Sequence, residues 1–219
     1  MNREVRAVIF DQDGLMFDTE RLSQEAWLIT AQQVGIKMED SIFANIRGMN
    51  HRDCVAFLNT WFEGKVDCEA LRTQKQACIE RLLEERGVPV KPGLKHLLEY
   101  LKEHGIKTAL ATGSNKSYTE RNLEAVGIVE YFQYIVTGDM VSHAKPDPEI
   151  FQRAAEGLGE APEFCMVLED SQNGLEAGIR GGFITVMVPD LSQPDEVLRS
   201  RVDWVCESLE EVKDLVAKR

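Results

Sequence analysis

The stretch IFDQDGLMFDTE, residues 9–20, begins at the end of the apolar run VRAVIF. Four acids lie within ten positions of this stretch: Asp11, Asp13, Asp18 and Glu20. Two carboxylates about 4 Å apart repel by roughly 1 kcal/mol in water and by roughly 4 kcal/mol at the effective dielectric of a partly buried site. A buried strand that ends in so much like charge therefore predicts a compensating cation.

The composition limits the classes of function. The chain has 219 residues, 43% of them apolar, which is enough to bury a core in one domain or in two unequal ones. Its 37 acids and 25 bases give a net charge of −12, which argues against nucleic acid or an anionic membrane as a partner. Five cysteines without a C-x-x-C pair predict free thiols in a reducing compartment. No stretch approaches the roughly 18 apolar residues of a membrane span, so we expect a cytoplasmic protein. We also expect a monomer.

Short apolar runs predict strands that are covered on both faces, because the runs are nearly continuous rather than alternating. They are VRAVIF (5–10), IKTALAT (106–112), YIVTG (134–138), FCMVL (164–168), FITVMV (183–188) and VDWVC (202–206). Helical patterns that end in glycine lie between most of them, for example at residues 94–105 and 148–159. The alternation predicts an α/β fold with a doubly wound parallel sheet.

The interval between the first two predicted strands breaks this alternation. Residues 20–35 and 68–87 carry apolar side chains at spacings of three and four, and both segments end in glycine. We therefore predict a small all-helical domain at residues 18–88, inserted into an α/β core made of residues 1–17 and 89–219.

Polar motifs lie where the predicted strands end. Asp11-Gln12-Asp13-Gly14, Thr112-Gly113-Ser114-Asn115 and Glu169-Asp170-Ser171 follow strands, and Lys145-Pro146-Asp147-Pro148 precedes a helix. Ligands of open parallel sheets bind outside the carboxyl ends of the strands, where the strand order reverses. These motifs are therefore expected to form one pocket that holds acids, a hydroxyl group and one ammonium group.

The residue types in this pocket suit phosphoryl transfer. Asp11 and Asp13 are two positions apart and leave the same face of an extended segment, while Gly14 permits a sharp turn. One carboxylate can attack as a nucleophile and form an acyl phosphate, and the other can exchange protons with the leaving group and with water. Mg²⁺ would compensate the acids, and Thr112 and Lys145 would bind the remaining phosphoryl oxygens.

The motifs D-x-D-G-x-x-x-D-T, T-G-S-N, K-P-D-P and E-D-S, in this order, resemble those of the haloacid dehalogenase-like superfamily. The resemblance covers nearly the whole chain and includes the helical insert, which is similar to a type 1 cap. It implies a Rossmann-like core, with Asp11 as nucleophile and Asp13 as general acid and base. It further implies phosphate binding by Thr112, Gly113, Ser114 and Lys145, and Mg²⁺ binding by Asp11, the carbonyl of Asp13, Glu169 and Asp170.

Within this superfamily the sequence is most similar to the branch of β-phosphoglucomutase and small sugar-phosphate phosphatases. Dehalogenases proper lack the second aspartate of the first motif, and Asp13 is present here. The resemblance therefore implies a Mg²⁺-dependent phosphohydrolase that acts on a small phosphorylated metabolite, such as a sugar phosphate, through an aspartyl-phosphate. Glu20 and His51 are the candidate substrate contacts in the cap.

A phosphomutase is the alternative within this branch. Its mutases carry a His five residues after the aspartate that corresponds to Asp18, and an Arg in a cap segment that resembles RGMNHRD (47–53). Ser23 and His51 occupy those two positions here. Both departures favour hydrolysis over the mutase reaction.

Simpler interpretations of the same residues exist. An Asp-rich calcium loop requires glycine at its sixth position after a helix, whereas Gly14 is fourth and follows a strand. The motif at residues 112–115, the pair Asp18 and Thr19, and the pair Glu169 and Asp170 could each only cap a helix. A receiver domain would be shorter and would carry an adjacent acidic pair after its first strand. A catalytically dead homologue would have lost one of the motif residues, and all are present.

Overall fold

The computed structural model describes residues 4–46, 49, 51–191 and 193–218. The chain divides into two compact units: Met1–Asp18 with Val90–Arg219, and Thr19–Pro89. Each unit is described by itself below.

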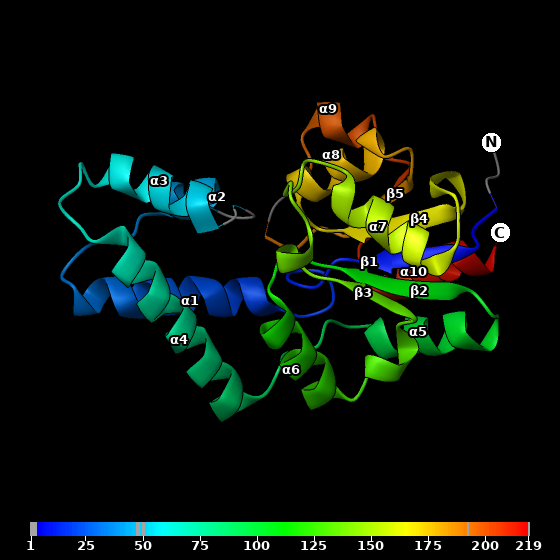
Figure 1. Ribbon diagram of the computed structural model, residues 1–219, viewed down its shortest axis with the longest axis horizontal. Helices are drawn as coiled ribbons and strands as arrows, with labels where there is room; N and C mark the ends of the chain where they lie inside the picture. Colours follow the sequence, from blue (N-terminus) through cyan, green and yellow to red (C-terminus); the bar gives the residue numbers. More distant parts are fainter. Residues whose placement is uncertain (1–3, 47–48, 50, 192, 219) are drawn as a thin grey trace. The chain divides into compact units, whose positions relative to one another are not determined.

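The first unit is built on a six-stranded sheet in which every neighbouring pair is parallel (Figure 1). The strands are β1 (Ala7–Phe10), β2 (Lys107–Ala111), β3 (Tyr134–Val136), β4 (Cys165–Glu169), β5 (Ile184–Met187) and β6 (Trp204–Val205). Their order is β3-β2-β1-β4-β5-β6. The chain thus runs outward on one side from β1 to β3 and on the other side from β4 to β6, so the order reverses between β1 and β4.

Helices cover both faces of this sheet. They are α5 (Leu94–Glu103), α6 (Lys116–Val126), α7 (Glu149–Leu158), α8 (Gln172–Arg180), α9 (Glu196–Arg199) and α10 (Leu209–Ala217), with short 3-10 turns η1 (Val129–Tyr131), η2 (Gly138–Met140) and η3 (Pro162–Phe164). In Figure 1, α7, α8 and α9 lie on one face, and α5 and α6 lie on the other. All residues of β1, β4 and β5 are buried, as expected for strands between two helical layers.

Side chains of the sheet and of α7 form one continuous core. Ile9, Ala109 and Val167 from the central strands pack with Phe151 and Ala154 of α7. The edge-on contact of Phe151 with Phe183 has a centroid distance of 6.0 Å, within the range typical of favourable aromatic pairs. This packing fixes the backbone from which the polar motifs project.

The described residues of the second unit form helices and the loops between them, without a strand. It consists of α1 (Thr19–Gln33), α2 (Asp40–Ile46), α3 (His51–Trp61) and α4 (Cys68–Arg86). Buried apolar residues such as Trp27, Phe43 and Leu58 form its own core. Arg86 makes two parallel bonds of 2.8 Å to Glu25, which join the end of α4 to α1.

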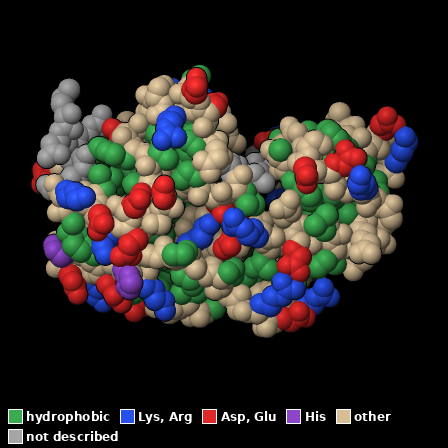
Figure 2. All heavy atoms as spheres, turned by 180° about the vertical axis from the view of Figure 1, so that it is seen from behind, with side chains coloured by type: hydrophobic (Ala, Val, Ile, Leu, Met, Phe, Trp, Pro, Cys, Tyr) green, Lys and Arg blue, Asp and Glu red, His purple; other side chains and the backbone are tan. Residues whose placement is uncertain are grey.

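The predicted α/β fold with a doubly wound parallel sheet is confirmed. All five cysteines are free and buried, as their spacing predicts. Among the described residues, no helix combines the length and the apolar character that crossing a membrane requires. On the face seen in Figure 2, acidic and basic side chains are interspersed with small apolar areas and form no continuous basic surface.

Candidate active site at the strand-order reversal

The carboxyl ends of β1 and β4 lie side by side and carry three acids. Phe10 pairs with Leu168, and the amide of Asp11 donates to the Leu168 carbonyl over 3.1 Å. Asp11, Glu169 and Asp170 each offer one carboxylate oxygen, and these oxygens all lie within 4.8 Å of one another. All three residues are buried. The sheet therefore concentrates negative charge at the point where its strand order reverses.

The ammonium group of Lys145 lies between two of these acids. Its Nζ donates to Asp11 Oδ1 over 2.5 Å and to Glu169 Oε1 over 2.6 Å. A third bond of 3.2 Å reaches the carbonyl of Ala111 at the end of β2. Nζ also lies 4.8 Å from the ring centroid of Phe151, close enough for a cation–π attraction. Lys145 thus has a partner for each of its three N–H donors.

Burial and neighbouring charges set the ionisation of this group. Burial raises the pKa of Asp11 to about 8, with Lys145 lowering it and Glu169 raising it again. Burial disfavours the charged form of Lys145, but Asp11 and Glu169 outweigh this effect and raise the pKa of its ammonium group. With all three acids ionised, the single ammonium leaves two negative charges uncompensated, and a bound cation would favour that ionised state. An all-oxygen donor set with this charge fits Mg²⁺.

Gly14 and Gly174 have no side chain, and the space that a Cβ would fill at each is occupied by an acid of the site. Gly14 has a φ of +86°, and a Cβ there would lie 2.3 Å from Asp170 Oδ2. A Cβ on Gly174, in the first turn of α8, would lie 1.8 Å from Glu169 Oε1. The Glu169 carboxylate is fixed at its other oxygen, because Oε2 accepts from the amide and the hydroxyl of Ser171 over 3.1 and 2.8 Å. Side chains at either glycine would therefore displace an acid of the site.

Hydrogen-bond donors from a different segment surround the carboxylate of Asp13. Ser114 Oγ donates to Asp13 Oδ2 over 2.7 Å, and the Tyr118 hydroxyl donates to Oδ1 over 3.3 Å. Gln12 Nε2 makes a longer contact of 3.4 Å with Oδ2. The two hydroxyl groups can donate to a carboxylate or turn and accept from a protonated acid, so they can serve Asp13 in both states.

The loop after β2 is held rigidly. Thr112 is buried, its amide donates to the Val136 carbonyl over 3.0 Å, and its Oγ1 accepts from the Ser114 amide over 3.1 Å. The Ser114 carbonyl accepts from the amide of Gly138 over 2.8 Å, and a Cβ at Gly138 would lie 2.3 Å from the Gly113 carbonyl oxygen. The predicted phosphate-binding residues of this loop therefore have a defined backbone.

The helix-capping interpretations have different outcomes. Ser171 caps α8 by accepting from the Gly174 amide over 3.1 Å, so the interpretation that Glu169 or Asp170 only caps this helix is wrong. In the motif after β2, Asn115 caps α6 by accepting from the Tyr118 amide over 2.9 Å. That motif therefore serves both purposes, since Asn115 starts the helix while Ser114 contacts Asp13.

The two predicted substrate contacts belong to the helical unit. Glu20 lies half-buried in the first turn of α1. His51 begins α3 with an exposed side chain: its Nε2 lies 2.8 Å from Glu69 Oε2, and its Nδ1 accepts from Arg72 Nε over 2.9 Å. In the segment around His51, positions 47, 48 and 50 lie outside the described residues.

Sequence reasoning missed Tyr118 and the bond of Ser171 to Glu169. Tyr118 lies in the first turn of α6, but Ser114 precedes this helix, so helical spacing alone does not pair the two residues. Ser171 belongs to the motif Glu169-Asp170-Ser171, but only the structure reveals that its hydroxyl donates to the Glu169 carboxylate.

Comparisons with known proteins indicate the family to which the chain belongs. The family model of haloacid dehalogenase-like hydrolases matches residues 5–182. The phosphorylated carbohydrates phosphatase of Thermotoga maritima is 34% identical over 182 residues, which cover 81% of this chain and 82% of that protein. The β-phosphoglucomutase of Bacillus subtilis is 29% identical, with 94% of this chain and 95% of that protein covered.

A solved structure extends the likeness to three dimensions. CbbY from Rhodobacter sphaeroides, crystallised in complex with phosphate, is 26% identical and superposes with a TM-score of 0.80. The match covers 95% of this chain and 96% of that one. With a family model that spans most of its length and a relative above 30% identity, the chain belongs to the haloacid dehalogenase-like hydrolase family.

Proposed function

We propose that the protein is a Mg²⁺-dependent phosphatase that hydrolyses small phosphate monoesters, in particular sugar phosphates, through an aspartyl-phosphate on Asp11. The observation that carries this proposal is the cluster of Asp11, Glu169 and Asp170, in which Asp11 and Glu169 both bind the ammonium of Lys145. Ser114 and Tyr118 hold a second aspartate, Asp13, which can exchange protons. A nucleophile, a proton donor and a cation within one rigid frame are the parts that phosphoryl transfer needs.

In the first half of the reaction, the Asp11 carboxylate attacks phosphorus as the bond between phosphorus and the ester oxygen breaks. Asp13, in its protonated form, gives its proton to the departing alkoxide and becomes a carboxylate. The Lys145 ammonium and donors of residues 112–114 bind the phosphoryl oxygens, where charge develops. A phosphoryl group on Asp11 and a free alcohol result.

In the second half, a water molecule attacks the phosphorus of the aspartyl-phosphate. The Asp13 carboxylate takes a proton from that water, and the acyl phosphate bond breaks to restore Asp11 and release inorganic phosphate. The hydroxyl groups of Ser114 and Tyr118 stabilise the carboxylate form of Asp13 until water attacks the aspartyl-phosphate. The proton that Asp13 receives prepares it for the next ester.

Mg²⁺ bound by Asp11, Asp170 and the carbonyl of Asp13, with Glu169 nearby, would neutralise the acids and withdraw charge from the transferred phosphoryl group. Turnover of p-nitrophenyl phosphate should therefore require Mg²⁺ and stop in EDTA. A separate readout is the melting temperature, which Mg²⁺ should raise in the wild type and raise less in Asp170→Asn. Full turnover in EDTA would remove the ion from the proposal.

The two aspartates can be separated by labelling. Asp11→Asn should abolish turnover because an amide does not attack phosphorus, whereas Asp13→Asn should slow both proton transfers and leave the nucleophile intact. After rapid quenching with a radioactive phosphate ester, wild-type protein should carry label on Asp11. Stable label on Asp11→Asn, or label at any other residue of the wild type, would refute the assignment.

The class of substrate rests on the relatives. One of them is named as a phosphatase of phosphorylated carbohydrates, and the residues proposed to contact the substrate, Glu20 and His51, belong to the helical unit. A panel of hexose, pentose and triose phosphates, nucleoside monophosphates and p-nitrophenyl phosphate should show the highest kcat/KM for a sugar phosphate. Glu20→Gln and His51→Ala should change the ranking of sugars and leave p-nitrophenyl phosphate nearly unaffected. A preference for nucleotides would contradict this choice.

A phosphomutase is the second candidate, favoured by the likeness to the β-phosphoglucomutase of Bacillus subtilis. A mutase must keep water from its aspartyl-phosphate while an intermediate turns around. Incubation with β-glucose 1-phosphate, Mg²⁺ and catalytic β-glucose 1,6-bisphosphate separates the two activities when glucose 6-phosphate and free phosphate are followed together. We expect phosphate release to exceed isomerisation, and the reverse result would establish the mutase instead.

A further inference from the structure

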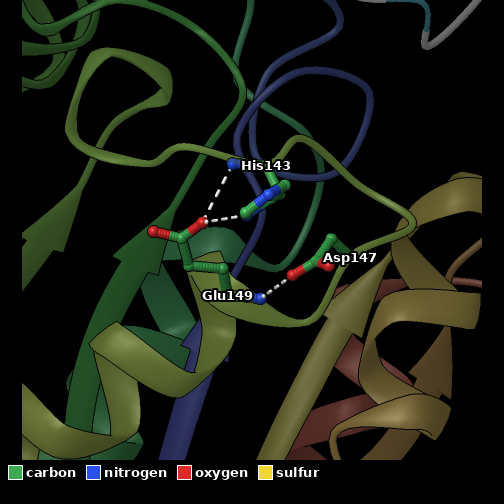
Figure 3. Close-up of side chains that lie close together, drawn as sticks. All are labelled: His143, Asp147 and Glu149. Carbon is green, nitrogen blue, oxygen red and sulfur yellow. Dashed lines mark hydrogen bonds and ion pairs between the residues drawn. The ribbon is translucent and has the colours of Figure 1, made fainter.

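The carboxylates of Asp147 and Glu149, drawn in Figure 3, accept hydrogen bonds from the backbone of the loop that carries Lys145. Glu149, the first residue of α7, turns its carboxylate back toward the backbone of His143. Asp147 Oδ1 accepts from the amide of Glu149 over 2.9 Å, and the amide of Asp147 donates to the Ala144 carbonyl over 3.0 Å. Lys145 lies in the chain between these contacts.

Glu149 accepts hydrogen bonds on both of its oxygens. Oε2 lies 2.9 Å from the amide nitrogen of His143, 3.1 Å from that of Ser142 and 3.1 Å from His143 Nδ1. Oε1 accepts from Arg153 Nε over 2.9 Å and lies 2.7 Å from Arg153 Nη2. The Glu149 side chain is only 17% exposed. These donors, first of all the Ser142 amide, lower the pKa of Glu149 to about 2, so it remains a carboxylate at neutral pH.

The contacts of His143, Asp147 and Glu149 favour a structural role in holding the loop over the binding of a metal ion. His143, Asp147 and Glu149 are side chains that can bind a metal ion, and their ligand atoms lie within 4.8 Å of one another. However, the oxygens of Glu149 already face two backbone N–H groups, the His143 ring and the Arg153 guanidinium, and Asp147 Oδ1 faces the Glu149 amide. A cation would have to displace these donors, most of which are fixed by the backbone.

We propose that Glu149 is a positioning residue for Lys145. Its bonds to the amides of Ser142 and His143 fix the backbone two and three positions before Lys145, and Arg153 fixes Glu149 on α7 in turn. The Lys145 ammonium reaches both Asp11 and Glu169 within 2.6 Å, and bonds of this length permit little movement of the loop. A positioning error of about 1 Å can reduce a rate about a hundredfold.

This inference rests on the proposed function, in which Lys145 binds a phosphoryl oxygen. Without Glu149, the amides of Ser142 and His143 lose a charged hydrogen-bond acceptor. The loop would then sample more conformations, and the ammonium would spend less time at the phosphate position. The loss should therefore weaken phosphate binding and raise KM more than it lowers kcat.

The test measures binding of inorganic phosphate by calorimetry in the presence of Mg²⁺, together with kcat and KM for p-nitrophenyl phosphate. Glu149→Ala should raise Kd and KM about tenfold. Glu149→Gln, whose carbonyl oxygen can still accept from the amides, should raise them about threefold. Glu156→Ala, an exposed change on the same helix, is the matched control and should change neither.

A double-mutant cycle with Lys145→Met distinguishes positioning from general stabilisation. If Glu149 acts through Lys145, Glu149→Ala should weaken phosphate binding less than about twofold when Lys145 is already Met. A purely structural role would give additive losses in the cycle and would overturn the inference. A Glu149→Ala protein that binds phosphate as tightly as wild type would also overturn the proposed positioning role.

The outcomes separate this inference from the function on which it rests. If wild type fails to hydrolyse any ester, or Lys145→Met binds phosphate like wild type, the proposed function or its lysine assignment fails. If Lys145→Met weakens binding and the Glu149 variants do not, only the positioning role fails. Should Glu149→Ala not fold, Glu149→Gln and Arg153→Ala, each taken through the same cycle, decide the question.

Discussion

Lys145 Nζ lies 2.5 Å from Asp11 Oδ1 although 134 positions separate the two residues. Both side chains are nearly buried, with exposed fractions of 12% and 10%. An ammonium at this distance stabilises the carboxylate that is proposed to attack phosphorus, and the same group is proposed to bind a phosphoryl oxygen. The same lysine can therefore hold the nucleophile in the free enzyme and bind substrate during turnover.

Replacing this ammonium should affect both activity and stability. Lys145→Met should lower kcat/KM about 10²–10³-fold, the usual loss on removing one donor from a developing oxyanion. It should also destabilise the fold by about 3–5 kcal/mol, because Asp11 and Glu169 are left buried without their cation. Lys116→Met, which removes an exposed partner of Glu120, should change stability by less than about 0.5 kcal/mol. Kinetics and thermal unfolding measure both effects, and a fully active Lys145→Met protein would contradict the assignment.

Gly174→Ala tests the space around Glu169. Alanine ordinarily favours a helix over glycine by about 1 kcal/mol, but the added Cβ would lie 1.8 Å from Glu169 Oε1. We expect a lower melting temperature and at least tenfold weaker Mg²⁺ binding, because Glu169 must leave Lys145 and Ser171. Gln172→Ala, an exposed change in the same turn, should leave both unchanged. A more stable Gly174→Ala protein would show that Glu169 moves aside without cost.

Tyr118→Phe removes the hydroxyl that contacts Asp13 and keeps the ring. If this hydroxyl orients the general acid, kcat/KM should fall about three- to tenfold for an alkyl phosphate, whose leaving group needs a proton. For p-nitrophenyl phosphate, whose leaving group departs without protonation, kcat/KM should change less than about twofold. Tyr134→Phe, an exposed residue of β3, is the matched control. Equal losses with both substrates would exclude a role through the acid.

The pKa of Glu149 predicts how its contribution to stability depends on pH. Its value in the folded protein is about 2, below the ordinary value of 4.5. The stabilisation is therefore complete above about pH 5 and is lost as the pH falls toward 2, since protonation is less favourable in the folded state than in the unfolded one. The melting temperatures of wild type and Glu149→Gln should differ most near neutrality and converge in acid. A constant difference across this range would contradict the predicted linkage.

The fold could be predicted from the sequence to a large extent. All six predicted strands occur, because apolar runs such as AVIF at residues 7–10 can be satisfied only between two covering layers. The helices at 94–103 and 149–158 begin and end within two residues of the patterns that predict them. The pairing of β1 with both β2 and β4 results from packing. The periodicity of the sequence does not indicate which strands become neighbours.

The candidate site could be predicted as a set of motifs and not as a set of contacts. Asp11 and Asp13 are only two positions apart, yet they have different partners. Asp11 accepts from Lys145, and Asp13 accepts from Ser114. The bonds of Glu149 to the amides of Ser142 and His143 depend on the direction in which its side chain leaves the start of α7. Such directions follow from the rotamer and the packed backbone, which a pattern of residue types does not determine.

The central place of β1 in the sheet has a consequence for synthesis of the chain. Ala7 leaves the ribosome well before its two strand partners, Lys107 and Cys165. Until β4 is made, the first strand has no neighbour on one side, and the nascent chain cannot assemble Asp11 with Glu169 and Asp170. Contacts this distant along a chain form slowly. A growing or truncated chain therefore exposes a strand that is fully buried in the finished fold while it still lacks two acids of the candidate site.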